Sequence, residues 1–136
     1  MKKQKKRNYT ELEIFKEFSD LSRELRFSIK NHMKRYDKFD VGDEIKRFLR
    51  QIKFVISDAN SLPNNCKLPK LEELCSLLEH LEISLSDCIE DGSLSLSGRF
   101  NINLPLSRLE NVKNQANSWK DYVEDKYYSQ DVCIPD

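Results

Sequence analysis

Basic side chains recur along one side of each of the first two helices that the sequence predicts. Four cations of the first helix are spaced i, i+3, i+7 and i+11, which aligns them, and four more follow between residues 46 and 53. Phosphate binding requires clustered cations of this kind, because affinity for nucleic acid comes mostly from counterion release. The predicted nucleic-acid-binding residues are Arg23, Arg26, Lys30, Lys34, Lys46, Arg47, Arg50 and Lys53.

Acidic residues lie among these cations, and they leave a second interpretation open. Glu24, Asp43 and Glu44 could form ion pairs with the same basic residues along each helix, which would make both faces ordinary solvated surfaces. The sequence shows no evident aromatic platform on which bases could stack, which argues against sequence-specific recognition of a single strand.

Charge is also divided unequally between the two parts of the chain, although the net charge is zero. Residues 1–60 carry 16 Lys and Arg against 10 Asp and Glu, and residues 61–136 carry 7 against 13. Such a chain can bind a polyanion with its basic part, or bind a copy of itself head to tail. Solvated helix faces would give the same pattern.

No constellation typical of an enzyme is present in the sequence. The two histidines, His32 and His80, are expected on the surface, and no H-E-x-x-H, P-loop or G-x-S-x-G motif occurs. The Glu-x-x-His pairs of bundle-core metal sites are missing as well. We therefore expect a protein that is not an enzyme and has no cofactor or metal.

The four cysteines indicate a reducing compartment. Cys75 and Cys88 fall on or beside an apolar stripe, where a free cysteine packs as a small hydrophobic residue, while Cys66 and Cys133 lie in a loop and a tail. No C-x-x-C pair, secretory signal or apolar run long enough for a membrane span is present. The expected location is the cytoplasm.

Four segments repeat apolar residues at spacings of three and four, which predicts four helices. The first would begin at Thr10 as N-cap and run to about Tyr36. The second follows a short link, Asp37–Asp40, with Asp40 as N-cap. Their apolar positions are Ile14, Phe18, Leu21, Leu25, Ile29, Met33 and Tyr36, then Val41, Ile45, Phe48, Ile52, Val55 and Ala59.

The third and fourth helices follow a predicted loop at residues 60–68. Pro69 suits the first turn of the third helix and Gly92 its left-handed C-cap. The fourth helix should start between Asn103 and Ser107. Their apolar positions are Leu71, Leu74, Leu78, Leu81, Leu85 and Cys88, then Leu109, Val112, Ala116, Trp119 and Val123.

Residues 93–104 alternate polar and apolar side chains, which is also a strand pattern. A lone hairpin is marginal in water. We favour an ordered loop that places Leu94, Leu96 and Phe100 against the helices.

Short links between long helices favour an antiparallel up-down-up-down four-helix bundle. The predicted organisation is a flexible basic arm at 1–9, the all-α bundle at 10–128 and a flexible tail at 129–136. Several apolar residues exceed what one stripe needs, so we expect self-association, with an unusually thick bundle as the alternative. The surplus residues are Phe15, Phe27, Leu49, Phe54, Ile56, Leu77 and Ile83.

The order of several short motifs resembles one bacterial family of four-helix bundles. Residues 39–49 (FDVGDEIKRFL) open the second helix, 68–74 (LPKLEEL) open the third, and 78–81 (LEHL), 92–95 (GSLS) and Trp119 follow. Together these span roughly residues 15 to 125. The family comprises the accessory variability determinant of diversity-generating retroelements and the proteins encoded by intervening sequences in 23S ribosomal RNA genes.

The resemblance implies a homopentameric ring of four-helix bundles. In the retroelement branch the ring binds the reverse transcriptase and nucleic acid, RNA or cDNA, and is needed for mutagenic retrohoming. It therefore predicts a non-enzymatic accessory protein of such an element. The alternative is a protein–protein adaptor or structural module that does not bind nucleic acid, whose divided charge serves assembly.

Overall fold

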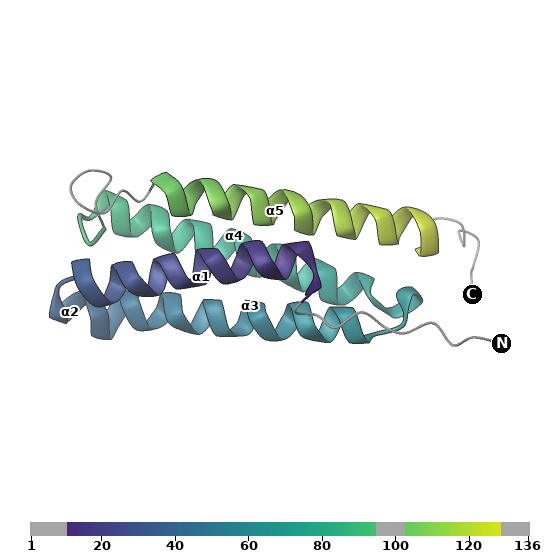
Figure 1. Ribbon diagram of the computed structural model, residues 1–136, viewed down its shortest axis with the longest axis horizontal. Helices are drawn as coiled ribbons and strands as arrows, with labels where there is room; N and C mark the ends of the chain where they lie inside the picture. Colours follow the sequence, from purple (N-terminus) through teal and green to yellow (C-terminus); the bar gives the residue numbers. More distant parts are fainter. Residues whose placement is uncertain (1–10, 95–102, 129–136) are drawn as a thin grey trace.

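The computed structural model describes residues 11–94 and 103–128, which form helices joined by short turns and include no strand. Four long helices lie along the length of the molecule: α1 (Glu13–His32), α3 (Asp43–Ser61), α4 (Leu68–Glu90) and α5 (Asn103–Val123) (Figure 1). The all-α prediction is confirmed. Within the described part of the chain, no helix is both long and apolar enough to cross a membrane.

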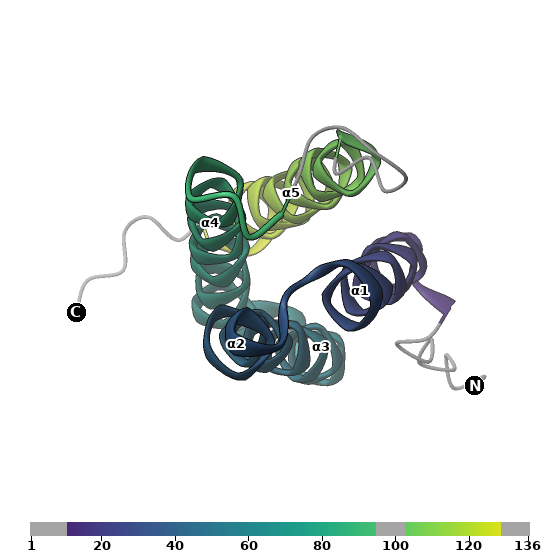
Figure 2. The same ribbon diagram turned by 90° about the vertical axis from the view of Figure 1, so that its left-hand side faces the viewer.

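The long helices surround one apolar core, to which each contributes its stripe. Seen end on, they occupy the four corners of the bundle (Figure 2). α3 packs closely on α4, α4 on α5 and α5 on α1, whereas α1 and α3 contact each other only loosely. The seam between α1 and α3 is therefore the least tightly packed side of the bundle.

The predicted core of the third and fourth helices is confirmed. All six predicted positions of α4 are buried, and so are Leu109, Val112, Ala116 and Val123 of α5, with Trp119 partly buried. Pro69 lies in the first turn of α4, and Gly92 follows its end with a φ of 87°. Leu94 is buried as expected, and its N–H donates to the carbonyl of Cys88.

The predicted link at Asp37–Asp40 is wrong, because those residues are helical. The chain is extended at Met33 and Lys34, then forms α2 (Arg35–Asp37) and a π-helical turn, η2 (Lys38–Gly42), that continues into α3. Asp40 therefore does not cap α3. Tyr36 is 79% exposed and does not belong to the core of the first helix.

Close packing explains where this turn lies. A Cβ at Gly42 would come within 3.0 Å of Ile29 and 3.1 Å of Met33, so the turn sits directly against the end of α1. Met33 is itself buried and is the last core residue of this segment. Tyr36, three residues later, is exposed.

The start of α1 also differs from the prediction. Leu12 stands at the N-cap with no side-chain cap bond. Thr10 lies outside the described residues. So do Leu96 and Phe100, the arm at 1–9 and the tail at 129–136.

Two residues assigned to the surplus apolar set, Leu49 and Ile56, are fully buried instead. They lie on α3 directly beside predicted positions, so the buried face of this helix is wider than the predicted stripe. Phe15 and Leu77 are half-buried, whereas Phe27, Phe54 and Ile83 are each more than half exposed.

A buried lysine joins α3 to α4. The 3-10 turn η3 (Asn64–Cys66) connects the two helices, and the ammonium of Lys67 donates to the carbonyls of Ala59 (2.6 Å), Leu62 (2.7 Å) and Asn60 (3.2 Å). These carbonyls lack partners within α3 because the helix ends there. A cation at this position also suits the negative end of the helix dipole.

The final π-helical turn, η4 (Glu124–Tyr128), ties α5 to the same connection. The Tyr128 hydroxyl donates to the carbonyl of Asn65 (2.6 Å) and accepts from the N–H of Leu68 (3.3 Å). The amide of Asn64 donates to the Tyr127 hydroxyl (3.0 Å). Three helix ends are thus held together at this end of the bundle.

Replacing Lys67 with Met should lower the free energy of unfolding by about 1.5–3 kcal/mol, because hydrogen bonds from a charged donor are lost and carbonyls at the end of α3 lose their partner. Urea denaturation followed by circular dichroism measures the change.

Lys70→Met is the matched control, since Lys70 forms only surface ion pairs with Glu73 and Asp58 and should cost at most about 1 kcal/mol. Equal effects of the two substitutions would show that Lys67 does not hold the connection.

Candidate nucleic-acid interface

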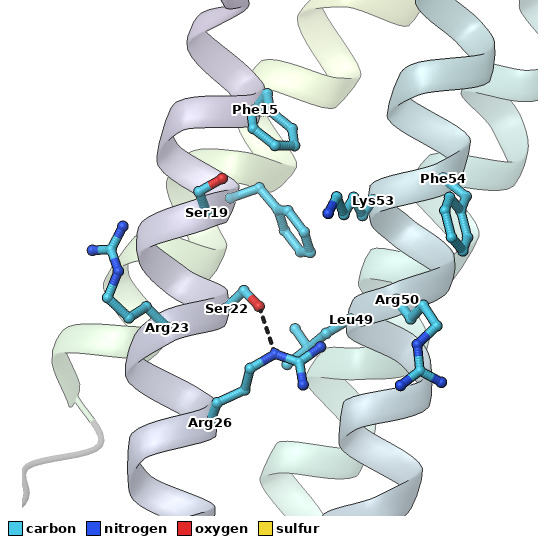
Figure 3. A pocket seen from close by; sticks show the side chains of 10 residues that line it. Phe15, Ser19, Ser22, Arg23, Arg26, Leu49, Arg50, Lys53 and Phe54 are labelled. Atoms are coloured by element: carbon cyan, nitrogen blue, oxygen red, sulfur yellow. Dashed lines mark hydrogen bonds between the residues drawn. The ribbon is translucent and has the colours of Figure 1, made fainter. Parts of the chain in front are cut away.

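A groove of about 500 Å³ runs along the loose seam between α1 and α3. Four of the eight predicted nucleic-acid-binding residues line it: Arg23 and Arg26 from α1, and Arg50 and Lys53 from α3. In Figure 3 the side chain of Arg26 extends from α1 toward α3, and that of Lys53 extends from α3 toward α1. The fold thus brings together cations from two segments of the chain. We call this feature the α1–α3 groove.

The other four predicted residues do not line the groove. Lys30 lies in the last turn of α1 and Lys34 in the extended segment that follows it. Lys46 forms an ion pair with Asp43 at 3.5 Å, and Arg47 is exposed on α3.

The floor of the groove is apolar. Phe18 and Leu49 line it and are 2% and 1% exposed. Their side chains belong to the core, so the floor has no open apolar pocket at these residues. Phe15, Ser19 and Ser22 line the α1 side, and Phe54 lies on α3 with its side chain 57% exposed. Figure 3 shows the Phe54 ring one turn from Arg50 on the same helix.

The groove carries positive charge that the described residues only partly compensate. Arg23 pairs with Asp20 at 2.9 Å, and their side chains are 73% and 41% exposed. Arg26 Nε donates to Ser22 Oγ at 3.2 Å, which is a bond to a neutral partner. Within the described ranges, Arg50 and Lys53 have no carboxylate within ion-pair distance, and no acidic residue lines the groove.

Three carboxylates of α1 contact α5 and do not line the groove. Arg108 of α5 contacts Glu24 (2.9 Å), Glu17 (3.4 Å) and Asp20 (3.6 Å). The pKa of the Arg108 guanidinium is raised, mainly by its hydrogen bond to Glu24. The buried stripe of α1 thus separates an acidic flank beside α5 from a basic flank beside α3.

Sequence reasoning found the cations of the groove but missed its aromatic residues. Phe15 and Phe54 were assigned to a surplus apolar set, yet they line the same groove as the arginines. One signal was present in the sequence: Arg50 and Phe54 are four residues apart, a spacing that places two side chains on one face of a helix.

Two thiols of the described chain, those of Cys75 and Cys88, lie wholly or partly in the bundle. Burial raises the pKa of Cys88 to about 11, and burial likewise raises the pKa of Cys75, whose thiol donates to Asn117 Oδ1 at 3.4 Å. Both thiols are therefore protonated at neutral pH, and thiols of that kind are poor nucleophiles.

The histidines offer no catalytic arrangement either. His32 and His80 are exposed, as predicted, with their rings beside Phe27 and Phe48. Over residues 11–94 and 103–128, no group of three or more His, Cys, Asp or Glu side chains could hold a metal ion.

Comparison with protein-family models, curated proteins and solved structures found no match to this chain.

Replacing Arg50 and Lys53 together with Gln should change the free energy of unfolding by no more than about 0.5 kcal/mol, since both are exposed and neither has an ion pair among the described residues. A small change in the free energy of unfolding is expected for residues that bind a ligand and do not stabilise the fold. Urea denaturation at low and high salt checks it.

Arg108→Gln is the contrasting variant, because it removes the ion pairs of Arg108 with three carboxylates of α1 and should destabilise the protein more than the double substitution does. If the double substitution of Arg50 and Lys53 lowers the free energy of unfolding more than Arg108→Gln does, these two cations stabilise the fold.

Proposed function

We propose that this protein is a non-enzymatic accessory protein of a diversity-generating retroelement, which binds the element's reverse transcriptase and nucleic acid and supports mutagenic retrohoming. The α1–α3 groove would hold RNA or cDNA. The observation that carries this proposal is that Arg26 and Lys53 extend into one groove from opposite sides (Figure 3), with Arg23 and Arg50 also in its lining and no described carboxylate there. Clustered cations without acidic partners favour a polyanionic ligand.

The resemblance of the sequence motifs to the accessory variability determinant family supports the remainder of the proposal. In this proposal the four helices follow an antiparallel up-down-up-down order and the subunits form a homopentameric ring in the cytoplasm. Large apolar side chains on the surface, such as Phe27, Ile83 and Tyr122, would pack between subunits or against the polymerase.

A protein–protein adaptor is the second candidate. The same exposed apolar residues favour it, together with Tyr36 and Phe39, which are 79% and 70% exposed. An adaptor uses its cations for protein partners or self-assembly, so it has no affinity for RNA that salt could reduce.

RNA binding should weaken steeply with salt. If each of the four groove cations neutralises one phosphate, affinity should fall by about 50- to 150-fold between 50 and 200 mM salt. The double variant Arg50→Glu with Lys53→Glu should abolish binding at physiological salt. Fluorescence anisotropy with a labelled RNA measures both effects.

The control carries the same change of charge on two residues that do not line the groove, Lys120→Glu with Lys126→Glu in the last turn of α5 and in η4. It should retain most of the affinity. If both double variants lose binding equally, net charge rather than the groove accounts for it, and if the native protein binds no RNA at 50 mM salt, the adaptor is favoured.

Light scattering should give a mass near five times that of the 16.1 kDa chain, or about 80 kDa. Exposed apolar side chains buried between subunits would hold this ring together, so the mass should persist at high salt. A monomer at all protein concentrations would contradict the ring.

A further inference from the structure

One aromatic ring of the α1–α3 groove is not part of the core. Phe54 is 57% exposed although it lines the groove, whereas Phe18 in the floor is 2% exposed. Arg50 precedes Phe54 by one helical turn and Lys53 is its neighbour (Figure 3). Neither cation is bound by a described carboxylate, so an exposed aromatic ring and two available positive charges lie on the same stretch of α3.

We propose that the α1–α3 groove takes single-stranded nucleic acid, with a base stacked on the Phe54 ring and the flanking phosphates held by Arg50, Lys53 and the arginines of α1. This inference rests on the proposed function, which it narrows to one class of nucleic acid. A positively charged groove with an aromatic ring is the usual arrangement for binding a single strand with little sequence preference.

A duplex fits these features less well. Its bases are stacked and paired internally, so a duplex would offer the groove its phosphates but no base for Phe54 unless a nucleotide were extruded, at a cost of a few kcal/mol. A single strand offers both groups without that cost. The exposed ring therefore gives the groove a preference for single strands that its cations alone would not provide.

An acidic amphipathic helix from a protein partner is the competing occupant. A helix bound in a groove inserts apolar anchors at i, i+3 or i+4 and i+7 into pockets. The floor here offers no such pockets, because Phe18 and Leu49 are almost completely buried in the bundle's own core. The apolar surface that remains open is the ring of Phe54 and part of the ring of Phe15, and flat rings suit a base better than a row of side chains.

The test compares one sequence as a fluorescein-labelled 20-nucleotide RNA strand and as the corresponding duplex, each titrated with the full chain by anisotropy at 50, 100 and 200 mM salt. We expect the single strand to bind at least tenfold more tightly. Phe54→Ala should weaken its binding by about 5- to 150-fold while leaving the slope of log K against log salt unchanged, because stacking releases no counterions.

Phe39→Ala is the matched control, since Phe39 is 70% exposed in η2 and does not line the groove. It should leave affinity unchanged. Arg50→Gln with Lys53→Gln should instead lower the salt slope by about two, one for each phosphate contact removed. Because Phe54 is exposed, Phe54→Ala should fold normally, which a thermal melt verifies.

The outcomes separate the inference from the proposed function. Equal affinity for the duplex, or full affinity in Phe54→Ala while the Arg50 and Lys53 variant is weakened, would overturn the single-strand inference and leave nucleic-acid binding intact. No binding of either RNA at 50 mM salt, with binding of an acidic amphipathic peptide in the same assay, would overturn both.

Discussion

The pairing of Arg108 with the carboxylates of α1 is the interaction on which the charge of the groove depends. Glu17, Asp20 and Glu24 lie on the flank of α1 that faces α5, where one guanidinium contacts all three. If this flank faced α3 instead, the same carboxylates would neutralise Arg50 and Lys53. By fixing how α1 is rotated about its axis, the apolar stripe and Arg108 together leave a basic flank beside α3.

The location of the groove follows from how the helices are joined. Lys67 holds the end of α3 to the start of α4, and Tyr128 holds η4 to the same connection. α1 is bound to α5 through the core and Arg108. The seam between α1 and α3 has no such interhelical bond among the described residues, which agrees with its loose packing. A groove forms there because the strong contacts of each helix point elsewhere.

The sequence was most informative where one helix face alone decides burial. In α4 and α5 the apolar period predicted the buried residues correctly, since each stripe faces a single core. On α3 it missed Leu49 and Ile56, because the buried face of this helix includes residues directly beside the predicted stripe, and the period alone does not fix the width of that face. It also placed a link at Asp37–Asp40, because it could not anticipate that Gly42 packs against Ile29 and Met33 and allows a π-helical turn.

The candidate site was predictable only in part, for a similar reason. Spacing along each helix aligned the cations, but nothing in the sequence indicated which of them face each other across a seam. Lys30, Lys34, Lys46 and Arg47 therefore appeared equivalent to the four that line the groove. Phe54 was counted among the surplus apolar residues. Its spacing placed it on the same face of α3 as Arg50, but that this face borders an open groove became evident only from the arrangement of the helices.

Ultraviolet crosslinking of the protein to RNA, followed by mass spectrometry of the crosslinked peptides, tests the central claim most directly because it locates the nucleic acid. If the α1–α3 groove holds it, crosslinks should fall within residues 13–32 and 43–61, with Phe54 among the modified positions. Crosslinks confined to α4 and α5 would contradict the account, since they would place the nucleic acid away from the groove.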